Sequence, residues 1–552
     1  MVGQDNTING KEEDPSVVMW KTVLPVMDWK RVLKIGTENH NTIKTILGWS
    51  CDLLTCVGPE IDLAGHNLTY SNRPEDIEGL KFNLCLIDEP SSLMGRKTKN
   101  EVIFMLRQLL ECLDEDGVLV LTLPNGFHLL NLKIQFHNII KQLGVKHVNS
   151  FICLPSFKTP THIFPFSKNT DYARKVVCEK FTVGTRGKRL VKMSVKWAIM
   201  KMMPLCSPFY DMMIIMTRSE RLSEENEAER LLGGYYAQRK LRSDEMFSVW
   251  GTQSSAEKQI GLIYYGEGDK KELLGVCKQS RLRSGRAEFI RKEFWNLNLL
   301  FEHRDELEKN SITVPRPIHL EADHEKIISI ESAIKGYPLE ILKWEMMRQH
   351  NFGKFSKEME KLISIHSVLR KVYGRIRRDI ARIPMWCFSR IEMSVEWLEN
   401  EERLDLYSDN VQHGDFTDVN LIYNVESKQW GIIDWEWLYS GFPYLFDLFY
   451  LFMSFEYHEK KIKSKTLMSR YFESFVDTYF RRNWFSNYFT KAALSYCDEV
   501  KIAKEYAFNY FLDFLLVNYN KNKYGYYRKE YTDLFEEMLR YSIANRDKYV
   551  LE

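Results

Sequence analysis

Two short segments in the last third of the chain hold the residues with the clearest chemistry. The first is HGDFTDVN, residues 413–420, and the second is GIIDWE, residues 431–436. Asp415 is suited to orient and deprotonate a hydroxyl group. Asn420 and Asp434 are suited to hold magnesium, a hard cation that takes oxygen ligands. These are the two tasks that phosphoryl transfer asks of a protein, because the metal offsets charge on the β- and γ-phosphates.

Short apolar segments flank both proposed metal ligands. Asn420 opens the strand-like segment LIYN, and Asp434 closes WGIID. If the two segments pair as a hairpin, both side chains come to one end of the sheet, within reach of one ion. The alternative is that Asp415 and Asp434 are ordinary turn carboxylates. The presence of both segments in this order disfavours it.

The order HGDFxxxN followed by IIDWE resembles the aminoglycoside phosphotransferase and choline kinase group, which shares the protein-kinase-like fold. The resemblance covers residues 243–530. It implies ATP as the phosphate donor, Mg²⁺ as the cofactor, and a bilobal domain whose helical lobe binds the acceptor. A protein kinase is the weaker reading, because HGD and IDW replace the usual HRD and DFG motifs.

The same resemblance implies a role for each residue of the two segments. Asp415 would be the catalytic base, and Asn420 and Asp434 would be the metal ligands. His413 would brace the catalytic loop, and Asp447 would hold that loop from behind.

A nucleotide site is implied further towards the N-terminus. Lys278 ends a strand-like segment, LLGVCK, and Glu293 falls in the next helix-like segment. This resembles the family's lysine on the α- and β-phosphates with its helical glutamate partner. Glu288 is the rival partner. The alternative is a solvent-facing lysine and a glutamate on a helix surface.

Other nucleotide contacts are implied by the resemblance alone. The segment expected to cover the phosphates has serines, Ser254 and Ser255, where a glycine-rich loop is usual. Serine hydroxyls and backbone N–H groups can still bind phosphate. Adenine would meet the backbone from Glu331 to Ala333, in the hinge between the two lobes.

The N-terminal half has a different pattern, in which apolar strands alternate with helical segments. Alternation with nearly all-apolar strands favours a parallel sheet covered on both faces. The strands are expected at 31–36, 52–58, 82–88, 117–124, 148–154 and 210–217, and the clearest helix at 100–113. The pattern resembles class I S-adenosylmethionine-dependent methyltransferases. That resemblance implies a cofactor site at Gly36.

Several residues depart from the methyltransferase pattern. Glu38 and His40 stand where the family has glycines, and Lys34 stands where it often has an acid. These departures leave three possibilities for the N-terminal domain: an active methyltransferase, a scaffold without cofactor, or a domain with a changed ligand.

The fold class is therefore α/β: a Rossmann-like methyltransferase domain followed by a bilobal kinase-like domain. A charged stretch between residues 218 and 243 separates the two patterns. After it, antiparallel strands are expected at 247–252, 259–266 and 272–279. The predicted divisions are a polar segment at 1–29, the methyltransferase-like domain at 30–218, a charged helical linker at 219–242, the kinase N-lobe at 243–338 and the helical C-lobe at 339–552.

The charge and the apolar content of the sequence bear on whether the protein binds nucleic acid or spans a membrane. The net charge is +2, from 77 basic and 75 acidic residues, so no nucleic acid is expected. No apolar run is long enough to span a membrane, and the first residues are polar, so a cytoplasmic location is expected. The basic stretch at 184–203 leaves peripheral membrane contact open.

The sequence predicts an ATP-dependent phosphotransferase acting on a hydroxyl of a small-molecule or carbohydrate acceptor, in the manner of surface-glycan modification. One alternative is a bifunctional enzyme that methylates and phosphorylates one acceptor. The other is a non-catalytic nucleotide-binding scaffold.

Overall fold

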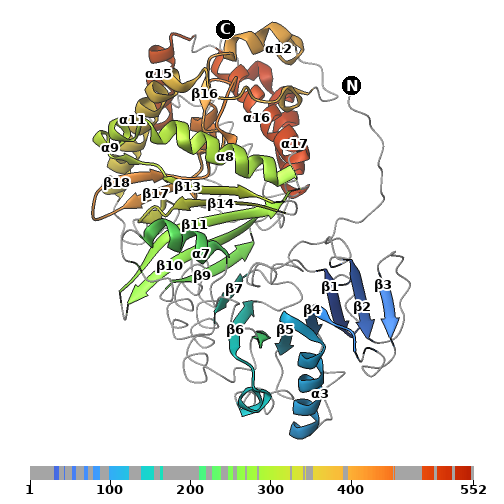
Figure 1. The fold of residues 1–552 in the computed structure, drawn as a ribbon. Coiled ribbons are helices and arrows are strands. Elements are labelled where there is room, and N and C mark those ends of the chain that lie inside the picture. The colour runs from blue at the N-terminus through green and yellow to red at the C-terminus, as the bar shows by residue number, and fades with distance from the viewer. Residues whose placement is uncertain are drawn as a thin grey trace. The chain divides into compact units, whose positions relative to one another are not determined.

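The chain divides into two compact units (Figure 1). The first comprises Met1–Ala287 with Glu321–Ile330, and the second comprises Glu288–Leu320 with Glu331–Glu552. The computed structural model describes, with a few single residues between them, residues 30–36, 52–57, 68–71, 79–87, 98–123, 138–154, 162–165, 211–218, 227–237, 246–252, 258–267, 270–282, 285–323, 326–339, 352–389, 396–451, 488–502, 506–524 and 529–548.

Five parallel strands open the first unit. They are β1 (Arg31–Ile35), β2 (Leu53–Val57), β3 (Leu68–Ser71), β4 (Phe82–Ile87) and β5 (Leu113–Leu123). Successive residues of a strand point to opposite faces, and Val32 and Leu33 are both fully buried. Helix α3 (Lys99–Glu111) connects β4 to β5 and begins with a capping box between Thr98 and Glu101. The predicted sheet, buried on both faces, is confirmed.

Three strands, each antiparallel to its neighbours, extend this sheet: β6 (His147–Leu154), β7 (His162–Pro165) and β8 (Asp211–Thr217). Strand β8 lies between β5 and β6 and is antiparallel to both. The order β3-β2-β1-β4-β5-β8-β6, with its last strand inserted in reverse, is that of a class I methyltransferase sheet. The sequence did not predict β3 or β7. The first is four residues long and only partly buried, and the second ends in a proline.

The same sheet continues through the strands expected of a kinase N-lobe. These are β9 (Met246–Thr252), β10 (Gln259–Glu267) and β11 (Lys270–Arg281), antiparallel as predicted, followed by β14 (Lys326–Ser332) and β13 (Pro317–Ala322). Strand β9 pairs with β7. Helix α7 (Glu227–Tyr236), in the predicted helical linker, packs against this part of the sheet, because buried Glu229 accepts a hydrogen bond from Ser248 on β9.

The second unit is mostly helical. Its longer helices are α8 (Gly285–Phe301, from Glu288 onward), α11 (Phe352–Ile376), α15 (Tyr488–Val500), α16 (Ala507–Tyr524) and α17 (Lys529–Ala544). The shorter ones are α9 (Arg304–Lys309), α12 (Glu396–Glu399), η6 (Met385–Phe388), η7 (Glu401–Tyr407), η8 (Trp435–Trp437) and η11 (Arg546–Lys548). Helix α16 is buried from Ala507 to Asn522, so it forms the centre of this core.

Two small sheets present the loops of this unit. One has the order β12-β18-β17-β15 and is formed by β12 (Ile312–Thr313), β15 (Tyr337–Pro338), β17 (Leu421–Asn424) and β18 (Gln429–Ile432). The other pairs β16 (Val411–Gln412) with β19 (Tyr439–Ser440). The predicted hairpin is confirmed, because β17 and β18 are antiparallel with Leu421 opposite Ile432.

The sequence predicts no membrane-spanning segment. None of the helices that the structure describes is long and apolar enough to cross a membrane. The cysteines that the structure describes are all free thiols, most of them buried.

Candidate active site

The turn at residues 413–415 is held from behind by Asp447. Its fully buried carboxylate accepts backbone N–H groups from His413 at 2.8 Å and from Gly414 at 2.9 Å. Gly414 has a φ of +75°, and a Cβ atom there would lie 2.5 Å from the carbonyl oxygen of Trp437. Only glycine fits both the dihedral angle and the space. The predicted bracing contact of Asp447 is thus present.

His413 ties this turn to the end of β18. Its Nδ1 accepts the backbone N–H of Asp415 at 3.2 Å, and its Nε2 lies 3.1 Å from the carbonyl oxygen of Ile433. Those contacts need Nε2 to carry the proton and Nδ1 to carry a lone pair, which is the neutral ring. Burial lowers the pKa of His413, in agreement with that form. His413 therefore links the 413–415 turn to the end of β18, and its bracing role stays a prediction.

Asp415, the predicted base, is held by Asn420. The side-chain amide of Asn420 donates to the carbonyl oxygen and to Oδ2 of Asp415, both at 2.9 Å. Desolvation raises the pKa of Asp415 to about 6, although Lys521 and a hydrogen bond from Tyr450 favour its ionised form. At neutral pH the carboxylate is therefore mostly ionised and able to accept a proton.

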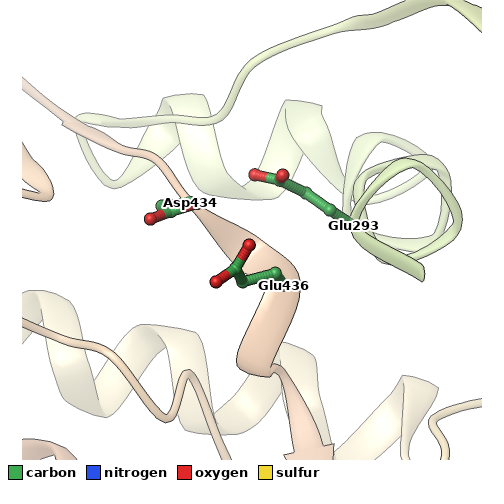
Figure 2. Close-up of side chains that lie close together, drawn as sticks. All are labelled: Glu293, Asp434 and Glu436. Atoms are coloured by element: carbon green, nitrogen blue, oxygen red, sulfur yellow. The ribbon is translucent and has the colours of Figure 1, made fainter. Parts of the chain in front are cut away.

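Asp434, the predicted metal ligand, lies where three carboxylates converge (Figure 2). Oxygen atoms of Glu293, Asp434 and Glu436 lie within 4.8 Å of one another. Glu293 reaches the group from α8 and also accepts the backbone N–H of Trp435 at 3.1 Å. Like charges this close repel, and a divalent cation with oxygen ligands offsets the repulsion. The donor set therefore fits magnesium.

The backbone around Asp434 has a conformation unusual for a side chain other than glycine. Its φ is 66°, in the left-handed region, where residues often belong to functional sites. Asn420 lies beside this strand end, because the main-chain N–H of Ile433 donates a hydrogen bond to the main-chain carbonyl oxygen of Asn420 at 3.1 Å. The two predicted metal ligands thus begin and end neighbouring strands, as the hairpin prediction requires.

The sequence did not single out Lys521 for this site. This buried lysine of α16 donates a hydrogen bond to the carbonyl oxygen of Gly414 at 2.7 Å. Its ammonium lies 4.2 Å from the ring centroid of Trp437. The available signal was its position on a stripe of buried residues with Phe514 and Val517, since residues four and seven apart share a helix face.

The remaining residues of the predicted nucleotide site are spread along the chain. Lys278 is buried on β11, and Glu331 is buried near the end of β14, with Ala333 just beyond it. Lys278 and Glu293 belong to different compact units, so their pairing stays a prediction. Glu288, the rival partner, pairs with Arg291 of its own helix at 2.7 Å.

Ser254 and Ser255 lie outside the described residues. Their role as phosphate contacts therefore stays a prediction from the sequence.

The end of strand β1 is where the methyltransferase-like fold implies a site for S-adenosylmethionine. Gly36 follows β1 with a φ of 89°, and its N–H donates to Val57 at 2.9 Å. Lys34 is fully buried on β1, and its ammonium donates to the Gly36 carbonyl at 2.9 Å. S-adenosylmethionine carries a sulfonium cation, and a buried ammonium at this strand end disfavours it. The structure thus places Lys34, one of the departures from the methyltransferase pattern, beside Gly36.

The fold and the two sites define the class. One part of the chain has a class I methyltransferase-like sheet. The other has a kinase-like arrangement, with a glycine-containing loop at residues 413–415, a β-hairpin and a helical core around Asp415.

Comparison with known proteins finds similarity only among solved structures. No protein family matches the sequence, and no curated protein does. The chain is similar to the bifunctional kinase-methyltransferase WbdD, at 10% identity over 86% of this chain and 84% of that one, with a TM-score of 0.21. It is also similar to aminoglycoside phosphotransferase APH(3'')-Id from Streptomyces rimosus ATCC10970 in complex with ADP and streptomycin, at 11% identity over 59% of this chain and 100% of that one, with a TM-score of 0.24.

A third similar structure is phosphoethanolamine N-methyltransferase 2 from Haemonchus contortus in complex with S-adenosyl-L-methionine. Its identity is 11% over 37% of this chain and 52% of that one, with a TM-score of 0.22. The function proposed below rests on this chain's own residues.

Proposed function

We propose that this protein is an ATP-dependent phosphotransferase that moves the γ-phosphate to a hydroxyl group of a small-molecule or carbohydrate acceptor. The observation that carries the proposal is the double hydrogen bond from Asn420 to Asp415. It places a carboxylate able to accept a proton directly beside an amide oxygen able to bind a metal. The carboxylate of Asp434 acts on the same base electrostatically.

The proposed reaction uses these residues as follows. Asp415 orients the acceptor hydroxyl and takes its proton as the hydroxyl oxygen bonds to the γ-phosphorus, and ADP leaves. Magnesium, when bound, offsets the charge of the phosphates. Asn420 and Asp434 would hold it, with Glu436 beside them. Lys278 would contact the α- and β-phosphates.

The acceptor follows less directly from the site. Aromatic rings surround Lys521, whose charge favours the ionised form of the base: Trp437 and Tyr450 flank this lysine, and Phe446 packs against Tyr450. Such rings suit the apolar faces of a sugar as well as a small amine. We therefore propose sugars and amino alcohols as the first acceptors to screen, and surface-glycan modification as the setting.

A combined methyltransferase and kinase is the alternative that Lys34 disfavours. Binding of S-adenosylmethionine would revive it. A thermal-shift titration of the whole protein with Mg–ATP and, separately, with S-adenosylmethionine distinguishes the two, because a ligand that binds only the folded state raises the unfolding temperature. We expect a shift with Mg–ATP alone.

The Asp415→Asn variant tests the mechanism. We expect it to bind Mg–ATP as wild type does and to transfer phosphate about 10²- to 10⁴-fold more slowly, because the amide cannot accept the proton. The matched control is Asp409→Asn, which removes an exposed carboxylate of the same unit. Transfer by Asp415→Asn at the wild-type rate would reject Asp415 as the base. Absence of any Mg–ATP shift in wild type would reject the proposed function.

A further inference from the structure

One lysine of the second unit lies where packing alone does not explain it. Lys521 is on the central helix α16 and is 2% exposed. Helix α16 is otherwise largely aromatic and aliphatic on this stripe, with Phe514 two turns earlier and Val517 one turn earlier. Burying an ammonium group is unfavourable unless other groups stabilise its charge. A methionine would fill similar volume without that cost.

The ammonium group of Lys521 points at the catalytic loop. Among the described residues it has one hydrogen-bond acceptor, the Gly414 carbonyl, at 2.7 Å. Around it lie the rings of Trp437 at 4.2 Å, Tyr450 at 5.4 Å and Phe446 at 5.9 Å. Aromatic rings attract a cation near their faces, so these rings contribute to stabilising the buried ammonium.

The charges that stabilise Lys521 belong to the site. Burial lowers the pKa of Lys521, and the charge of Asp415 is the strongest of those that oppose this effect, with Glu436 and Asp447 contributing as well. In return, Lys521 is the strongest favourable charge on Asp415. The two groups are therefore an electrostatic pair inside the protein, where such interactions are much stronger than in water.

The loop is thus held on both sides of one glycine. Asp447 accepts the N–H of Gly414, and Lys521 donates to the carbonyl of the same residue. The Gly414–Asp415 peptide is held at its carbonyl by Lys521 and at its N–H by His413, and the preceding peptide is held at its N–H by Asp447. That arrangement fixes the direction in which the Asp415 side chain leaves the backbone.

We propose that Lys521 is a positioning residue for phosphoryl transfer, which fixes the Gly414–Asp415 peptide and offsets the repulsion between the Asp415 carboxylate and the anionic phosphoryl group. The inference rests on the proposed function. During transfer the phosphoryl oxygens carry negative charge and approach a base that is itself an anion. A cation held behind that base lowers the repulsion at the moment of reaction, without contributing to nucleotide binding.

The test uses a transition-state mimic, because it needs no acceptor. Binding of Mg–ADP is measured by calorimetry with and without aluminium fluoride, which imitates the transferring phosphoryl group. In wild type we expect aluminium fluoride to tighten Mg–ADP binding about 10²-fold. In Lys521→Met we expect Mg–ADP affinity within about threefold of wild type and most of the gain lost. The unfolding temperature should fall, because Lys521→Met leaves the buried Asp415 carboxylate without its charge partner and the Gly414 carbonyl without its donor.

Two further variants separate charge from packing. Lys521→Gln keeps a donor for the Gly414 carbonyl but carries no charge, so it should lose most of the gain, whereas Lys521→Arg keeps the charge and should recover part of it. The matched control is Lys523→Met, two residues further along α16, where the lysine is exposed and lies 5.3 Å from the ring of Tyr519. It should behave as wild type. If Lys521→Met does not fold, the Gln and Arg variants carry the comparison.

Slow hydrolysis of Mg–ATP, followed as phosphate release, provides a second readout with water as the acceptor. We expect Lys521→Met to lower its rate about 10²-fold at saturating Mg–ATP. Full retention of both the aluminium fluoride gain and the hydrolysis rate in Lys521→Met would overturn the inference. Failure of wild type to bind Mg–ADP at all would instead overturn the proposed function, so the two failures are distinguishable.

Discussion

The side-chain amide of Asn420 donates to both the carbonyl oxygen and the carboxylate of Asp415, with both hydrogen bonds 2.9 Å long. Both bonds use the nitrogen of the amide, so its Oδ1 oxygen stays available for a cation. One residue therefore orients the proposed base and supplies an oxygen to the proposed metal. A substitution at Asn420 can therefore affect the orientation of the base, the binding of the metal, or both.

The Asn420→Asp variant should separate those two functions. A carboxylate keeps an oxygen for magnesium but has no N–H for Asp415, and it adds a negative charge next to the base. We expect the rate of phosphoryl transfer to fall about 10²-fold or more, while the magnesium concentration needed for half-maximal nucleotide binding stays the same or falls. Transfer rate and magnesium dependence are measured on the same preparation.

Asn424→Asp is the control for that change. Asn424 lies at the far end of the same strand and accepts backbone N–H groups from Glu426 and Ser427, which an aspartate also does. It should transfer phosphate at the wild-type rate. A wild-type rate in Asn420→Asp would mean that the amide hydrogen bonds do not orient the base.

Glu436 provides a second prediction, about metal binding. Its carboxylate lies within 4.8 Å of those of Glu293 and Asp434, so a cation relieves repulsion among all three. In the absence of nucleotide, magnesium at roughly ten times its dissociation constant should add about 1.4 kcal/mol to the free energy of unfolding. Glu436→Gln should weaken this effect, which is measured as the shift of unfolding temperature with added magnesium.

The control for Glu436→Gln is Glu426→Gln, which neutralises an exposed acid between β17 and β18. Its magnesium shift should equal that of wild type. An undiminished shift in Glu436→Gln would remove Glu436 from the metal site and leave Asp434 with Asn420 as the proposed ligands.

Local sequence predicts the parts of this site that are close together in the chain. The hairpin that carries Asn420 and Asp434 could be predicted, because both strands are short, apolar and separated by a few polar residues. The contact of Asp447 followed from the family resemblance. The proximity of Glu293 to Asp434 could not be predicted from the sequence, because it depends on how α8 packs against the hairpin some 140 residues later in the chain.

The position of Lys521 in the site could not be predicted from the sequence either, for a different reason. It follows Gly414 by 107 residues, and a single lysine in an apolar helix reads equally well as a solvent-facing residue. Only the packing of α16 into the centre of the unit decides the question. In the first unit, β3 was missed for a related reason: a short, partly exposed strand has too little apolar pattern to distinguish it from a loop.

His366 of α11 makes the stability of the second unit depend on pH. The ring is 2% exposed, and its Nε2 lies 3.6 Å from the carboxylate of Asp447, beyond normal hydrogen-bond length. Burial and the nearby Arg370 lower the pKa of His366, whereas Asp447 and Glu499 raise it, and burial is the largest effect. The folded protein therefore holds this histidine in its neutral form near neutral pH.

The sign of the effect follows from proton binding. Because the folded pKa is below the unfolded value of about 6.5, the unfolded chain takes up a proton first as the pH falls. The free energy of unfolding should therefore drop as the pH decreases through about 6.5. Between pH 7.5 and pH 5.5 the free energy of unfolding of wild type should therefore lose the contribution of His366. His366→Asn lacks this contribution.

The measurement is urea unfolding of wild type and His366→Asn at both pH values, followed by tryptophan fluorescence. That signal reports mainly on the second unit, whose core contains Trp430, Trp435 and Trp437. We expect wild type to be the more stable protein at pH 7.5 and its advantage to shrink at pH 5.5. An advantage that grows on acidification would show that His366 is protonated in the folded state and forms an ion pair with Asp447.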